Sequence, residues 1–109
     1  MRVQIAARHC DIPDTVRNRT EEQLFKLSRY DPRLSAAEVV FETVKHLKKA
    51  EAVLSVDGDE PVVAGGEGAE FRAAVDQMVD RLSRILRRRR DQRKDHQGPS
   101  LGETVIPEE

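Results

Sequence analysis

The chain has 109 residues, of which 38% are hydrophobic and 36% charged, and its formal net charge is -1. This length suits one domain with a modest core and a heavily charged surface. No segment approaches the roughly 20 apolar residues of a membrane-spanning helix, no signal peptide is apparent, and a lone Cys10 excludes an internal disulfide. We therefore expect a cytoplasmic protein without a membrane partner.

The charge is segregated along the chain, although the total is close to zero. Residues 1–49 carry a net +3 and residues 50–83 a net -6. Residues 84–96 hold seven basic and two acidic side chains, a net +5, and residues 97–109 carry -3. Because salt screens fields over roughly 8–10 Å, a partner responds to such local blocks more than to the total. The basic block favours a polyanion, and phosphate backbones are the usual one.

The first half of the chain predicts a strand, a helix and a second strand. Apolar and polar residues alternate over residues 3–7 and again over 38–43, which is the period of a half-buried strand. Between them, Pro13 suits a helix start, and apolar residues at three- and four-residue spacing extend to Leu27. We expect this helix over residues 13–29.

The second half predicts two more strands before the last helix. A polar connection at 45–48 precedes a strand at 51–56, and Asp57-Gly58-Asp59 is a hairpin turn signal. A short strand is expected at 61–64, and the glycine-rich segment 65–68 is interpreted as a flexible connector.

The last helix is expected over residues 70–94. Its apolar stripe runs from Phe71 to Leu86 and is followed by four consecutive arginines, of which Arg89 continues the stripe past the core. Residues 97–109 are expected to form a flexible acidic tail.

The predicted order is β-α-β-β-β-α, an α+β fold in which residues 1–96 form one domain. Each strand has one apolar face and each helix one apolar stripe, so both helices should pack on one face of a four-stranded mixed sheet. The first helix is a crossover that permits the first two strands to run parallel, whereas the short later connections predict antiparallel pairs.

Several stretches resemble the ribosome hibernation-promoting factor family, also called ribosome-associated inhibitor A or the sigma-54 modulation protein family. The resemblance covers about residues 1–96 and is carried by Arg8-His9, Leu24–Tyr30, Val44-Lys45-His46, Lys49-Ala50-Glu51, Phe71–Asp76 and Asp80-Arg81-Leu82. Phe25 departs from the family pattern, where a charged residue is usual, and its spacing places it opposite the apolar stripe of its helix.

The resemblance implies the same fold and a function in stress or stationary phase. Family members bind the small ribosomal subunit in the channel used by messenger and transfer RNA, and so inhibit translation. For this chain the resemblance thus implies the small subunit and its ribosomal RNA as partners. A monomer without cofactor, small-molecule substrate or catalytic activity is expected.

Helical spacing sorts the candidate RNA-binding residues into flanks. Arg81, Arg84 and Arg88 share one flank of the last helix, and Arg87, Arg90 and Lys94 share the other. Arg19, Lys26 and Arg29 share a flank of the first helix, and Lys45, His46 and Lys48 add charge at the turn between the second and third strands. Helices on one sheet face can place such flanks along a shared groove, where arginine and lysine grip phosphate.

Other chemistry has weaker support in the sequence. The histidines and Cys10 lack metal-ligand spacing, and no nucleophile–base pair suggests an enzyme. Asp76 and Asp80 are expected to pair with Arg72, Arg81 or Arg84 on the same helix. Two alternative functions remain open, namely a generic double-stranded RNA-binding module and a regulator that docks an acidic protein.

Overall fold

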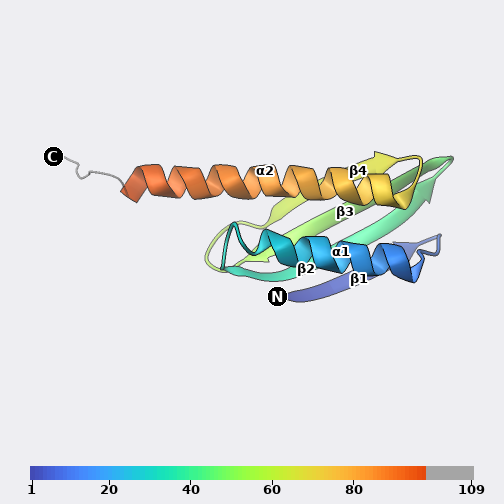
Figure 1. Ribbon diagram of the computed structural model, residues 1–109, viewed down its shortest axis with the longest axis horizontal. Coiled ribbons are helices and arrows are strands. Elements are labelled where there is room, and N and C mark those ends of the chain that lie inside the picture. The colour runs from blue at the N-terminus through green and yellow to red at the C-terminus, as the bar shows by residue number, and fades with distance from the viewer. Residues whose placement is uncertain (98–109) are drawn as a thin grey trace.

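Figure 1 shows the computed structural model of the protein, which describes residues 1–97. The elements are β1 (Arg2–Arg8), α1 (Asp14–Leu27), β2 (Leu34–Val44), β3 (Leu47–Val56), β4 (Val62–Gly68) and α2 (Phe71–Gln97). The predicted β-α-β-β-β-α order is confirmed. The acidic tail predicted at 97–109 lies outside the described residues, apart from Gln97, which belongs to α2.

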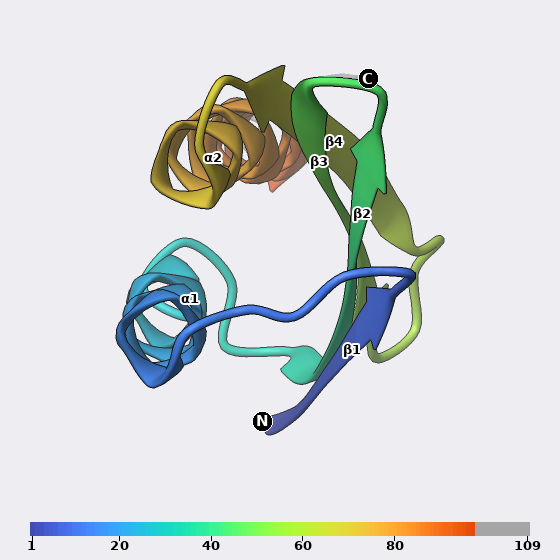
Figure 2. The same ribbon diagram turned by 90° about the vertical axis from the view of Figure 1, so that its right-hand side faces the viewer.

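The sheet has the predicted mixed topology. Its strand order is β1-β2-β3-β4, with β1 parallel to β2 and the other neighbours antiparallel. Figure 2 looks along the helices and shows both on the same side of the curved sheet. Within residues 1–97, the second face of the sheet carries no helix, and α1 and α2 lie side by side on the first.

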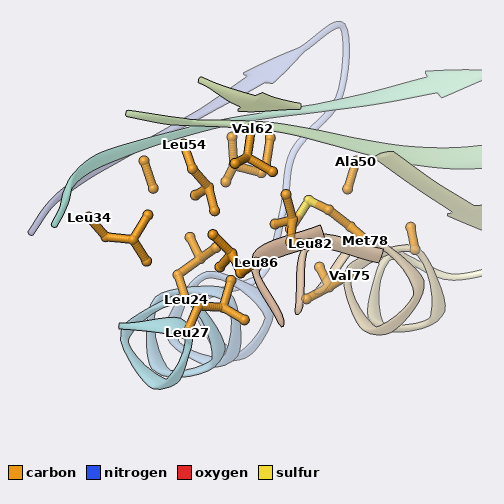
Figure 3. Packing of buried hydrophobic residues seen from close by; sticks show 14 of the residues in the cluster. Leu24, Leu27, Leu34, Ala50, Leu54, Val62, Val75, Met78, Leu82 and Leu86 are labelled. Carbon is orange, nitrogen blue, oxygen red and sulfur yellow. The ribbon is translucent and has the colours of Figure 1, made fainter. Parts of the chain in front are cut away.

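The core fills the space between this sheet face and the two helices (Figure 3). Leu24 and Leu27 from α1 meet Leu82 and Leu86 from α2, and Leu54 of β3 lies above them. These side chains are at most 2% exposed. Leu86 is the last buried apolar residue of α2, so the helix continues beyond the end of the core.

The strands are longer than the sequence predicted, and β2 and β3 begin four residues early. β2 begins at Leu34, and β3 begins at Leu47, within the segment 45–48 that the sequence indicated as a polar connection. Val44 pairs with Leu47, which leaves Lys45 and His46 as a two-residue turn. Lys45 adopts a φ of 59°, the left-handed conformation that tight hairpin turns require. Lys48 consequently lies in a strand and not in a loop.

The prediction of a flexible connector at residues 65–68 is wrong, because these residues form the second half of β4. Gly66 faces α2, and a Cβ there would lie 2.6 Å from the backbone nitrogen of Met78 and closer still to the carbonyl oxygen of Ala74. Glycine thus marks a close approach of strand and helix backbones here. The N–H of Glu67 donates to the side chain of Gln77 at 2.9 Å and closes the same contact.

Helix α1 begins at a proline and exposes one large apolar side chain. Pro13 occupies the cap position of α1, where its carbonyl accepts from Val16 and Arg17 at 3.0 and 3.1 Å. Phe25 is 48% exposed, as its position on the helix predicted. Neither described helix is long and apolar enough to cross a membrane.

Candidate nucleic-acid interface

An open groove of about 400 Å³ runs between α1 and α2. On its α1 side lie Lys26 and Arg29, which are both exposed. Gln23, Leu27 and Tyr30 lie on the same side. On its α2 side lie Asp76, Val79, Asp80 and Ser83. The predicted groove therefore exists, but α2 contributes acidic side chains to it along this stretch.

The basic residues gather where the groove meets the C-terminal half of α2. Tyr30 lies just beyond the end of α1, and the guanidinium groups of Arg87 and Arg90 stand 5.9 and 5.7 Å from the centre of its ring. Such cation–π contacts hold both arginine side chains in place. The Nε of Arg90 is buried and lies 3.9 Å from the carboxylate of Asp91, so Arg90 has fewer N–H groups to offer a second partner. Since Lys26 and Arg29 line the groove with Tyr30, four cationic side chains converge here, and we call them the Tyr30 cluster.

The second flank of α2 faces away from α1. Arg81 donates to the carbonyl oxygen of Gly65 at 2.7 Å and so covers the outer edge of β4. Arg84 is 67% exposed and pairs with Asp80 at 2.9 Å, one turn earlier. Arg84 and Arg88 line a shallow hollow of about 480 Å³ with Arg87. This flank is thus basic and exposed, but it does not border the groove between the helices.

Asp76 pairs with a residue that the sequence did not indicate. Arg19 of α1 donates to Asp76 through two nitrogens, at 2.9 and 3.1 Å. The expected partners on α2 are therefore wrong for Asp76, although Arg84 is confirmed for Asp80. The cause is that the helices pack closely enough for a pair across them, 57 residues apart in the chain. Arg19 joins the two helices and has less freedom to reach phosphate.

The basic turn at Lys45 and His46 lies at the other end of the molecule (Figure 1). Both side chains are exposed, whereas Lys48 is half-buried and stands 5.3 Å from the ring centre of Phe71, at the start of α2. With a rise of 1.5 Å per residue, Phe71 and Arg87 are roughly 24 Å apart along the helix. The basic turn is therefore separate from the Tyr30 cluster and from the outer flank of α2. The side chain of Lys94 lies outside those described.

Sequence reasoning missed a network centred on Asp31. Its carboxylate is only 1% exposed and accepts from the Arg33 side chain through both oxygens at 3.1 Å, and from the Arg33 backbone at 3.0 Å. Arg93 of α2 reaches the same carboxylate at 3.4 Å. The sequence signal is Asp31 directly before Pro32, a pattern that also ends helices and so does not by itself indicate a buried carboxylate.

These contacts determine the protonation of Asp31 and of Asp59, which joins the network because it lies 3.4 Å from Arg33. Burial by itself raises the pKa of the Asp31 carboxyl, but hydrogen bonds from Arg33 and the charges of Arg33 and Arg93 outweigh it, so the pKa is lowered. The backbone N–H of Glu60 lowers the pKa of Asp59, and the nearby arginines lower it further. Both carboxylates are therefore charged at neutral pH.

Replacing Asp31 by asparagine is expected to destabilise the fold by about 2 kcal/mol, because a buried charge partner is removed from two arginines. This figure is below that of a fully buried pair, since Arg33 and Arg93 are each 35% exposed. The thermal midpoint should fall by roughly 10 °C. Glu38→Gln, an exposed neutralisation on the open sheet face, is the control. A midpoint equal to that of the control would contradict the prediction.

The wild type and Asp31→Asn should respond differently to acid. Because the pKa of Asp31 is lowered by folding, its contribution is present above the unfolded-state pKa of about 4 and is lost as pH falls through the folded-state value. The difference in stability between the wild type and Asp31→Asn should therefore shrink below about pH 4. Urea titrations at several pH values measure this difference.

The described residues offer no site for a metal ion. Within residues 1–97, no three His, Cys, Asp or Glu side chains come together in a way that could hold one. Cys10 is half-buried, and its thiol lies 3.7 Å from the carbonyl oxygen of Phe41.

Most of the chain is similar in sequence to proteins of one known family. Residues 3–94 match the family described as sigma 54 modulation protein / S30EA ribosomal protein. The ribosome hibernation promoting factor of Azotobacter vinelandii is 32% identical over 108 residues, which cover 98% of this chain and all of the relative. The factor of the same name from Escherichia coli K12 is 30% identical over 96 residues, which cover 88% of this chain and all of the relative.

Solved structures show the same fold. The N-terminal domain of Protein Y from Thermus thermophilus superposes with a TM-score of 0.73 at 30% identity, covering 81% of this chain and 98% of that domain. A ribosomal subunit interface protein from Coxiella burnetii superposes with a TM-score of 0.77 at 22% identity, covering 84% of this chain and 99% of that protein.

Proposed function

Because the chain belongs to the sigma 54 modulation protein / S30EA ribosomal protein family, we propose that it is a ribosome-binding factor that inhibits translation under stress or in stationary phase. It acts without catalysis, and its partner is the small ribosomal subunit. Residues 1–96 form the binding unit, which works as a monomer in the cytoplasm.

The observation that carries this proposal is the convergence of cationic side chains in the Tyr30 cluster. Lys26 comes from α1 and Arg29 from the segment just after it, and Arg87 and Arg90 come from α2. A charge density of this kind on a rigid surface is more than folding requires, and it suits the phosphates of a folded RNA. Contacts of this type recognise backbone shape and carry little sequence information.

Inhibition would follow from occupancy. The folded domain fills part of the channel used by messenger and transfer RNA, and its basic helix surfaces hold it on ribosomal RNA. The exposed turn at Lys45 and His46 supplies a second point of attachment at the far end of α2. Two separated contacts restrict the orientation of the domain, which a single cluster would not do.

Sedimentation with purified small subunits tests the proposal. If about five phosphates are contacted, raising monovalent salt from 50 to 200 mM should weaken binding roughly 10²- to 10³-fold. Absence of co-sedimentation at 50 mM salt would refute the proposal. Equal affinity for a free RNA duplex would favour a generic double-stranded RNA-binding module, and salt-sensitive binding to an acidic protein without RNA would favour a protein-docking regulator.

A further inference from the structure

The arginine-bearing end of α2 extends beyond the hydrophobic core. After Leu86, the helix continues to Gln97, about three more turns, and Figure 1 shows this part projecting past the strands. A helical end without apolar contacts frays readily. Polar contacts must therefore hold this segment if its arginines are to keep a defined position.

Arg89 makes the first of these contacts. Its guanidinium donates to the carbonyl oxygens of Glu60 and Pro61 at 2.6 and 3.3 Å, and it lies 3.7 Å from the carboxylate of Asp59. The side chain is only 23% exposed, compared with 67% for Arg84 on the same helix. Arg89 is therefore turned toward the connection between β3 and β4.

Arg93 makes the second contact, one turn later. It reaches the buried carboxylate of Asp31 at 3.4 Å, in the connection between α1 and β2. Arg33 bonds to Asp31 and also lies 3.4 Å from Asp59. The two connections and the two arginines of α2 thus form one continuous network.

We infer that Asp31 and Asp59 are positioning residues, which hold Arg89 and Arg93 against the fold and thereby present Arg87, Arg88 and Arg90 to RNA. The run of four arginines divides accordingly: Arg89 serves the fold and the other three face outward or toward Tyr30. This inference rests on the proposed function, because it concerns how the same basic surface is arranged.

The inference predicts an effect opposite in sign to that of charge alone. Neutralising either aspartate removes one negative charge and so makes the net charge of the domain more positive by one unit. A more positive net charge by itself strengthens binding to a phosphate backbone. If the aspartates position the helix, their neutralisation should weaken binding to the small subunit despite the added charge. The two explanations cannot give the same result.

Asp59→Asn is the main test variant, because Asp59 is 33% exposed and its replacement should leave the domain folded. Asp31→Asn is the second variant, Asp59→Glu the conservative rescue, and Glu38→Gln the control with the same change of charge. Co-sedimentation with small subunits should be at least fivefold weaker for both asparagine variants, unchanged or tighter for Glu38→Gln, and restored by Asp59→Glu. Binding by Asp59→Asn equal to that of Glu38→Gln would overturn the inference.

Hydrogen exchange on the free protein provides a measurement that does not depend on the ribosome. The amides of residues 87–93 should exchange at least tenfold faster in Asp59→Asn. The amides of residues 74–82, in the part of α2 that is anchored in the core through Ala74, Met78 and Leu82, should keep their protection. Unchanged exchange at 87–93 would overturn the positioning role. If the wild type fails to bind ribosomes, the proposed function fails, and the exchange data still decide whether the aspartates hold this end of α2.

Discussion

Replacing Gly66 by alanine is expected to lower the free energy of unfolding by about 3 kcal/mol, although only one methyl group is added. The new Cβ would meet the backbone of Ala74 and Met78 on α2, and a backbone cannot rotate away as a side chain can. Either α2 moves outward, with loss of its contacts to β4, or β4 distorts. Denaturant unfolding monitored by circular dichroism measures the loss.

Gly65→Ala is the matched control in the same strand. A Cβ at Gly65 would lie 3.1 Å from the carbonyl oxygen of Ala50 and would make no close contact with α2, so a cost below about 1 kcal/mol is expected. Equal losses for the two variants would show that strand propensity, and not the approach of helix and strand, accounts for glycine at position 66.

Reversing the charge of Lys26 and Arg87 together is expected to weaken binding to the small subunit about 100-fold, equivalent to about 2.7 kcal/mol. These residues are members of the Tyr30 cluster from α1 and α2 respectively, so two favourable phosphate contacts become repulsive. Co-sedimentation at fixed salt gives the affinity, and thermal unfolding verifies that the variant is folded.

Two further double variants distinguish position from total charge. Arg2→Glu with Arg8→Glu makes the same change of charge on β1, outside the groove between the helices, and should weaken binding less than fivefold. Arg84→Glu with Arg88→Glu affects the outer flank of α2 and should cause an intermediate loss, about tenfold. If the β1 variant loses as much affinity as the Lys26 and Arg87 variant, the Tyr30 cluster is not the binding surface.

Local patterns predicted most of the secondary structure. Alternation of apolar residues located the first three strands, and a hairpin turn signal preceded the fourth. Helical spacing located both helices and divided the basic residues of α2 into two flanks. Boundaries were less accurate: β2 and β3 begin earlier than expected because pairing with a neighbour extends a strand through polar residues such as Lys48. The exposed position of Phe25 followed from helix geometry alone.

The sequence by itself determined the α+β fold, the order of strands and helices along the chain, and the presence of two basic flanks on α2. Periods of two and of 3.6 residues are local properties of the chain, which is why the sequence reveals them. The tertiary structure decided which flank of α2 meets α1 and which arginines form hydrogen bonds or ion pairs within the fold. It also leaves no room for a side chain at Gly66. Arg19, Arg89 and Arg93 find their partners 57, 29 and 62 residues away. Such distant pairs depend on how helices pack across a sheet, and no local spacing encodes that packing.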